Sequence, residues 1–111
     1  MRLIHYRTPG GRNVYQTWVD SLRDTAGRIA VMRRVDRLAE GNFGDCKVCR
    51  DGVSELRIDK GPGYRVYFSR LYGDIVLLLC AGDKSTQTQN IEQAVENLTT
   101  FTARGGNDDD D

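Results

Sequence analysis

Apolar residues recur along the first half of the chain with a helical period. Residues 2–6 form a short run compatible with a β-strand, which the turn residues after it end. Apolar positions then recur every three or four residues over 14–22, where Asn13 is a candidate N-cap, and again over 29–39. The pattern predicts two successive helices, and the second should bury Ile29, Met32, Val35, Leu38 and Ala39.

In the second half the period changes to two. A connection rich in Gly, Asp and Asn, with room for a short extended piece, covers 41–51. Residues 53–59 and 64–70 alternate as half-buried strands, whereas 75–80 (IVLLLC) has no polar face and is typical of a strand covered on both sides. A last helix follows over 86–101.

This order predicts an α+β fold, β-α-α-β-β-β-α, with a mainly antiparallel sheet packed against two N-terminal helices. We expect one domain over residues 1–104, followed by a disordered acidic tail over 105–111.

The charge balance favours a polyanionic partner. The chain has 111 residues, with 16 Lys and Arg against 16 Asp and Glu, but four of the acids are the aspartates 108–111. Most of the basic residues are arginine, whose planar fork of donors matches phosphate geometry. The longest apolar run, 75–80, is too short to span a membrane, and the first residues do not resemble an export signal. We therefore expect a cytoplasmic protein that does not bind membranes.

Cysteine and histidine give no evidence of a catalytic or metal site. Cys46 and Cys49 have the spacing of half a zinc site, but a second ligand pair is missing, so we expect reduced thiols, no metal and no cofactor. His5 lies inside the first predicted strand, where a packed histidine is the simpler interpretation.

Basic residues concentrate around the turn that joins the two alternating strands. Arg57 and Arg65 fall on the outward faces of these neighbouring strands, and Lys60 lies in the turn. Lys84 follows the buried strand and would approach Arg65 if that strand lies beside 64–70. Like charges on one sheet face repel, so a bound anion would explain the cluster, although the residues taken alone slightly favour a solvated charged face.

Two sequence blocks resemble a known family. Residues 52–68 (GVSELRIDKGPGYRVYF) and 73–87 (GDIVLLLCAGDKSTQ) are similar to the addiction-module killer proteins, a HigB-like subfamily of the RelE/ParE toxins of type II toxin-antitoxin systems. The resemblance implies an endoribonuclease that cleaves messenger RNA, often on the ribosome, and so inhibits translation. It also implies a cognate helix-turn-helix antitoxin as partner, and contact with operator DNA only through that antitoxin.

The resemblance also suggests roles for individual residues. Arg65 matches the arginine that contacts the scissile phosphate, Lys84 takes the place of a second basic residue, and Arg57 and Lys60 add positive charge. In such a site the 2′-hydroxyl attacks the adjacent phosphate, so Arg65 and Arg57 suit charge stabilisation. Lys60 or Lys84 is a candidate for proton transfer.

Substrate contacts are expected from three further residues. Tyr67, which shares the face of Arg65, or Tyr64 would stack on a base, and Asp83 would orient a basic neighbour. No tyrosine follows Tyr72, unlike RelE-type toxins that use one near the C-terminus. Two alternatives stay open: a ParE-like inhibitor of DNA gyrase without catalysis, and an inactive relative that keeps antitoxin binding.

Overall fold

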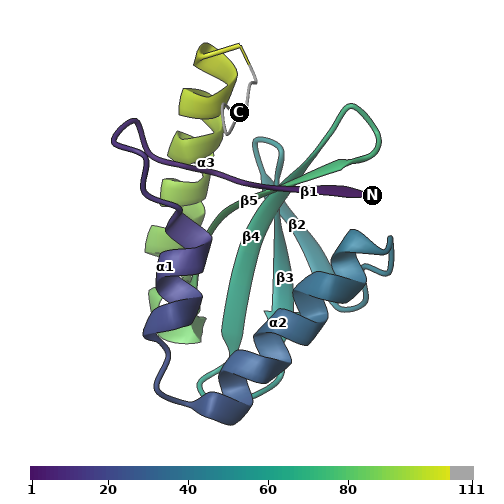
Figure 1. The fold of residues 1–111 in the computed structure, drawn as a ribbon, viewed down its shortest axis with the longest axis vertical. Helices are drawn as coiled ribbons and strands as arrows, with labels where there is room; N and C mark the ends of the chain where they lie inside the picture. Colours follow the sequence, from purple (N-terminus) through teal and green to yellow (C-terminus); the bar gives the residue numbers. More distant parts are fainter. Residues whose placement is uncertain (106–111) are drawn as a thin grey trace.

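The computed structural model describes residues 1–105 and places a sheet of five strands between two layers of helices (Figure 1). The fold is α+β. Its elements are β1 (Arg2–His5), α1 (Val14–Ser21), α2 (Thr25–Ala39), β2 (Cys46–Arg50), β3 (Val53–Ile58), β4 (Tyr64–Leu71), β5 (Ile75–Asp83), the 3-10 helix η1 (Lys84–Thr86) and α3 (Gln87–Ala103). Residues 106–111 of the predicted tail, which include its four aspartates, lie outside the described part of the chain.

The sheet is mixed, in the order β1-β5-β4-β3-β2. β1 pairs with β5 in parallel, and the other neighbours are antiparallel, so the predicted meander of β3, β4 and β5 is confirmed. The predicted order β-α-α-β-β-β-α differs from the observed one, because the connection over 41–51 contains β2 as a fifth strand. β2 was not predicted as a strand because its residues are mostly exposed and do not alternate between apolar and polar.

Each face of the sheet has its own core. α1 and α2 cover one face through Val19, Val35 and Leu38, which pack against residues such as Val66 and Phe68. α3 covers part of the opposite face, and its Ala94 and Phe101 pack with Tyr67, Leu77 and Leu79. β5 contributes to both cores, which confirms that IVLLLC is buried on both sides.

The predicted buried face of α2 is partly wrong. Ile29 and Met32 are 45% and 47% exposed, and the buried residues of this helix are Gly27, Val31, Val35 and Leu38. The physical reason lies at Gly27, where an added Cβ would meet the Tyr64 ring at 2.6 Å. This close approach of helix and sheet sets the rotation of α2 and turns Ile29 and Met32 outward.

His5 is a packing residue, as predicted. Asn13 caps α1 by accepting a hydrogen bond from the Gln16 backbone N–H, and its side-chain nitrogen lies 2.9 Å from His5 Nδ1. The His5 ring meets Tyr15 edge-on at 5.4 Å, and burial lowers the pKa of His5. His5 therefore helps to dock β1 onto α1.

The three cysteines are free, and burial raises the pKa of each thiol, to about 12 for Cys80. Within residues 1–105, no group of three or more His, Cys, Asp or Glu side chains is placed to hold a metal ion. None of the helices in this range is both long and apolar enough to cross a membrane.

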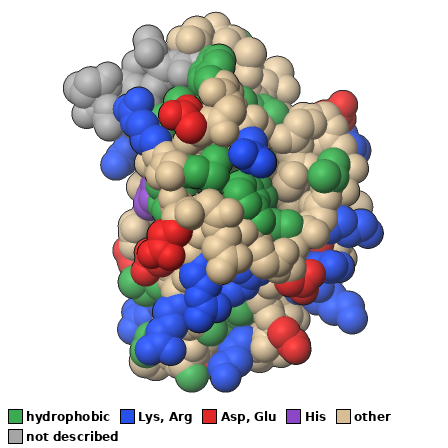
Figure 2. Space-filling view, turned by 90° about the vertical axis from the view of Figure 1, so that its right-hand side faces the viewer, with side chains coloured by type: hydrophobic (Ala, Val, Ile, Leu, Met, Phe, Trp, Pro, Cys, Tyr) green, Lys and Arg blue, Asp and Glu red, His purple; other side chains and the backbone are tan. Residues whose placement is uncertain are grey.

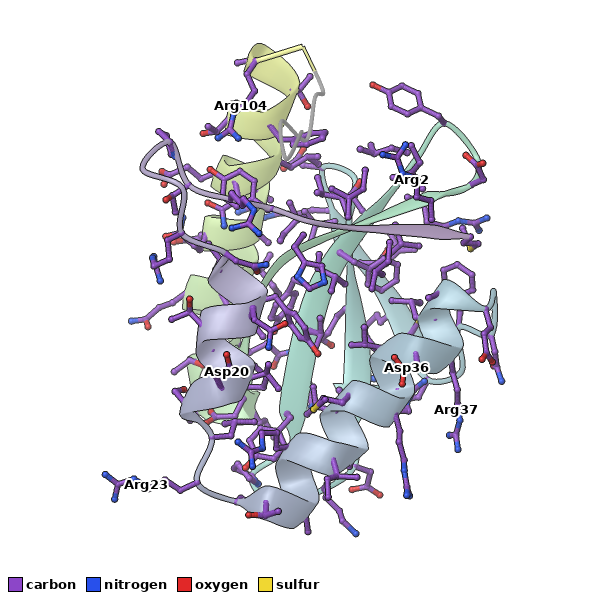
Figure 3. The ribbon with its side chains drawn as sticks, viewed as in Figure 1. Arg2, Asp20, Arg23, Asp36, Arg37 and Arg104 are labelled. Atoms are coloured by element: carbon purple, nitrogen blue, oxygen red, sulfur yellow. The ribbon has the colours of Figure 1, made fainter. Side chains whose placement is uncertain are left out.

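Positive charge is unevenly distributed on the surface. Figure 2 views the molecule from the side where α2 ends, and Lys and Arg side chains gather in the lower half of this face. Figure 3 shows Arg37 extending from the end of α2, and Arg23 extending from the connection between α1 and α2, both away from the fold. α2 and the connection before it therefore both contribute positive charge to the surface.

Candidate phosphate-binding site

An open pocket of about 490 Å³ lies where the β3–β4 turn approaches η1. We call it the Arg65 pocket; its polar lining residues are Asp45, Arg57, Asp59, Arg65 and Lys84. The predicted approach of Lys84 to Arg65 is confirmed, because β5 lies beside β4 and Arg65 pairs with Gly82, two residues before Lys84.

Two glycines bring the walls of this pocket together. Gly63 has a φ of +81° in the turn, and a Cβ there would lie 3.5 Å from Lys84 Cβ and 3.3 Å from Arg65 Nη1. A Cβ at Gly82 would collide with Asn90 Oδ1. Glycine at position 82 therefore lets the start of α3 pack closely on β5, which fixes Lys84 at the rim.

The Arg65 guanidinium is held in a fixed position. Its Nη1 donates to the carbonyl oxygens of Gly63 (3.0 Å) and Tyr64 (3.3 Å), and its Nε lies 3.7 Å from Glu55 Oε1. The Arg65 side chain is only 13% exposed. Nη2 has no hydrogen-bond acceptor among residues 1–105, so it is the donor that remains for a ligand.

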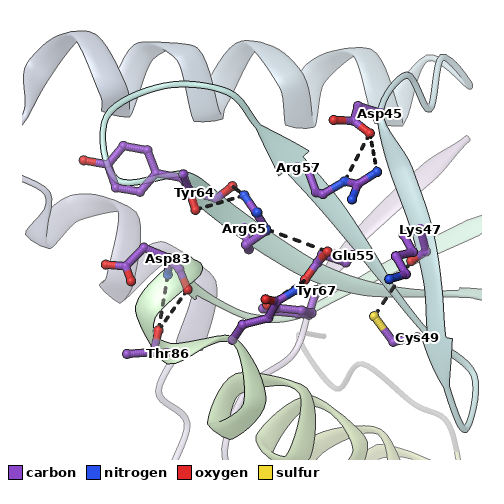
Figure 4. A network of polar contacts seen from close by, with 12 residues as sticks. Asp45, Lys47, Cys49, Glu55, Arg57, Tyr64, Arg65, Tyr67, Asp83 and Thr86 are labelled. Atoms are coloured by element: carbon purple, nitrogen blue, oxygen red, sulfur yellow. Dashed lines mark hydrogen bonds and ion pairs between the residues drawn. The ribbon is translucent and has the colours of Figure 1, made fainter.

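Glu55, behind Arg65, is a functional candidate that sequence reasoning missed. Its carboxylate is fully buried, and its Oε2 accepts hydrogen bonds from the Tyr67 hydroxyl (3.0 Å) and Gln87 Nε2 (2.7 Å) (Figure 4). Glu55 Oε1 and Arg65 Nε are both buried and, at 3.7 Å, form an ion pair without a hydrogen bond. The signal was present in the hairpin register, which places Glu55 directly opposite Tyr67.

The two tyrosines expected to stack on a base are not available for that role. Tyr67 lies on the face of Arg65, as predicted, but it is fully buried, and burial together with Glu55 raises the pKa of its hydroxyl. Tyr64 lies on the opposite face, where its hydroxyl donates to Asp24 Oδ2 (3.1 Å) and its ring meets Trp18 edge-on. Both residues have structural roles, and neither presents a ring face to the Arg65 pocket.

The remaining predicted residues have distinct positions. Arg57 donates from Nε (3.1 Å) and Nη2 (2.9 Å) to Asp45 Oδ1, and both partners line the pocket. Asp83 caps η1 by accepting hydrogen bonds from the backbone N–H and hydroxyl of Ser85, which uses the carboxylate that was expected to orient a basic neighbour. Lys60 does not line the Arg65 pocket and lines a neighbouring hollow instead.

The arrangement suits a phosphodiester. Three cationic side chains, Arg57, Arg65 and Lys84, converge on one open pocket, and the most rigid of them keeps a donor free. Donors fixed before a ligand binds stabilise negative charge without the cost of reorganisation. The pocket therefore offers fixed cationic donors of the kind that stabilise negative charge on a phosphate, beside the two carboxylates of its lining.

No family model matches this chain. A Haemophilus influenzae protein described as uncharacterized is 48% identical over 80 residues, which are 72% of this chain and 81% of that protein.

Proposed function

This chain belongs to the same family as the Haemophilus influenzae protein, and we propose that it is a type II toxin of the RelE/ParE superfamily that cleaves messenger RNA. The observation that carries the proposal is the convergence of Arg57, Arg65 and Lys84 on one pocket. The fold supports it, because two N-terminal helices pack on a mainly antiparallel sheet, as the sequence resemblance leads us to expect.

In the proposed reaction the RNA supplies its own nucleophile. The 2′-hydroxyl attacks the adjacent phosphorus and the bond to the 5′-oxygen breaks, which leaves a cyclic phosphate on one fragment. Arg65 donates from Nη2 to a non-bridging oxygen as negative charge grows there, while Glu55 keeps the guanidinium in place. The 2′-proton passes to water, and Lys84 at the rim protonates the departing oxygen.

The proposal includes the partners of a toxin of this class. A cognate helix-turn-helix antitoxin would neutralise the protein and carry it to operator DNA. The site of action would be the cytoplasm, with messenger RNA, free or on the ribosome, as the substrate. Inhibition of translation would be the result for the cell.

The experiment is induction in bacteria followed by mapping of transcript 5′ ends. The informative variant is Lys84→Ala, because Lys84 is exposed and makes no ion pair within residues 1–105. Arg23→Ala is the matched control, since it removes the same charge from a side chain that points away from the fold. We expect the wild type and Arg23→Ala to produce new ends inside coding regions, and Lys84→Ala to reduce them at least about tenfold.

Other outcomes would overturn the proposal. Intact transcripts with loss of DNA supercoiling would favour a ParE-like inhibitor of gyrase. Normal growth with antitoxin binding intact would favour an inactive relative.

A further inference from the structure

A second basic hollow, of about 370 Å³, lies on the other side of Arg57 from the Arg65 pocket. We call it the α2 hollow, because the C-terminal half of α2 forms one wall and the end of β3 with its turn forms the other. Its charged lining consists of the cations Arg33, Arg34, Arg37, Arg57 and Lys60 and the carboxylates Asp45 and Asp59. Asp45, Arg57 and Asp59 line both spaces, so the two are adjacent.

Two of the five cations are used by the fold itself. Arg34 donates to the backbone carbonyls of Asp45 (3.2 Å) and Arg57 (3.3 Å), and so joins α2 to the end of β3. Arg57 pairs with Asp45 at the boundary between the two spaces. These contacts within the fold account for the two arginines, and no ligand is needed to explain them.

The other three cations have no such explanation. The side chains of Arg33, Arg37 and Lys60 are exposed and make no hydrogen bond or ion pair with the rest of residues 1–105. Arg33 and Arg37 are one helical turn apart on α2, a spacing at which like charges destabilise a helix. None of the three forms a contact that holds the fold together, whereas a bound anion would relieve the repulsion between Arg33 and Arg37.

We propose that the α2 hollow binds a further phosphate of the RNA strand whose scissile phosphate occupies the Arg65 pocket. This inference rests on the proposed function and specifies its substrate as an extended single strand. The RNA strand passes from one space to the other at Arg57, which lines both the Arg65 pocket and the α2 hollow.

A single strand of RNA suits this surface better than a free anion does. The α2 hollow is open, and its free cations sit on long exposed side chains, so an isolated phosphate would bind weakly in salt. A phosphate tethered to one already bound benefits from a high effective concentration. Contacts of this kind position a nucleic acid without reading its sequence, so the hollow should affect affinity and not the chemical step.

The test uses RNA that contains 2′-deoxynucleotides and cannot be cleaved, in two lengths of about 4 and about 12 nucleotides. Fluorescence anisotropy compares the wild type with Arg33→Ala/Arg37→Ala. The control is Arg12→Ala/Arg23→Ala, which removes two exposed arginines away from both spaces. Circular dichroism confirms that each variant is folded.

We expect the α2 variant to bind the long strand at least about tenfold more weakly, and the slope of log affinity against log salt to fall by roughly 1.4 for two lost contacts. Its binding of the short strand should change less than about twofold. With cleavable RNA of the long length, KM should rise while kcat stays within about twofold.

Equal losses in the control variant, or equal losses for both strand lengths, would overturn the inference. So would a variant that binds RNA normally but has lost affinity for an acidic protein partner. If the wild type binds the long strand in this pattern but its induction in bacteria produces no new transcript ends, the proposed function fails and the α2 hollow stands.

Discussion

Arg65→Ala should destabilise the protein, because it removes the only cation paired with a fully buried carboxylate among residues 1–105. Glu55 would keep Tyr67 and Gln87 as hydrogen-bond donors, but both contact Oε2, and Oε1 would face the vacated space without a partner. Removing one member of a buried ion pair costs about 3 to 5 kcal/mol. Because Arg65 is 13% exposed and lies 3.7 Å from Glu55, we expect the lower end, about 3 kcal/mol.

The assay is urea denaturation followed by the fluorescence of Trp18, the single tryptophan of the chain, which packs edge-on against Tyr64. For a domain of 111 residues a loss of about 3 kcal/mol corresponds to a melting temperature lower by roughly 13 °C. The double variant Arg65→Ala/Glu55→Gln should recover part of this loss, because it leaves no buried charge without a partner.

The decisive quantity is the coupling free energy between the two positions. We expect about 1 to 3 kcal/mol from the double-mutant cycle of Arg65→Ala and Glu55→Gln. Strictly additive effects would refute the reasoning, since they would mean that the buried carboxylate does not depend on Arg65. Lys84→Ala is the internal control and should change stability by less than about 0.5 kcal/mol, because Lys84 is exposed.

Three further predictions address the fold. In urea denaturation, Leu38→Ala should lower the free energy of unfolding by about 2 to 5 kcal/mol, whereas Ile29→Ala should lower it by less than about 0.5 kcal/mol. Similar losses of stability in the two variants would show that α2 is rotated differently. Gly82→Ala should lower the melting temperature, because the new Cβ collides with Asn90 at the start of α3; an unchanged value would contradict the close packing of α3 on β5. Burial lowers the pKa of His5, so the unfolded chain binds the proton more readily and the free energy of unfolding should fall as pH drops below about 6.5. The urea midpoint of His5→Gln should depend less on pH in this range than that of the wild type. An equal pH dependence of the two midpoints would exclude His5 as the cause.

Local patterns predicted most of the secondary structure, because the period of the apolar residues depends on the element alone. They failed where a contact distant in sequence decides the outcome. The rotation of α2 depends on the approach of Gly27 to Tyr64, from another element. β2 forms because β3 offers a partner edge, although its own residues are mostly exposed.

The candidate site was predicted to a similar degree. The register of the hairpin and of the following strand was enough to bring Arg57, Arg65 and Lys84 together. Whether a side chain on the outward face is exposed depends on how far α3 extends over the sheet, which the sequence does not state. For this reason Tyr67 was expected to contact a base, although α3 covers that part of the sheet and the ring is buried.

The parallel pairing of β1 with β5 has a consequence for the order in which the chain folds. The first strand, Arg2–His5, pairs only with Ile75–Leu78 in the sheet, so it must wait for a partner about 70 residues away. At synthesis rates of about 5 to 20 residues per second, this delay is roughly 4 to 15 s. The hairpin of β3 and β4, which carries Arg57 and Arg65, has its partners close by in sequence and can form earlier. Lys84 follows β5, so the Arg65 pocket and the five-stranded sheet should be completed in the same late step of folding.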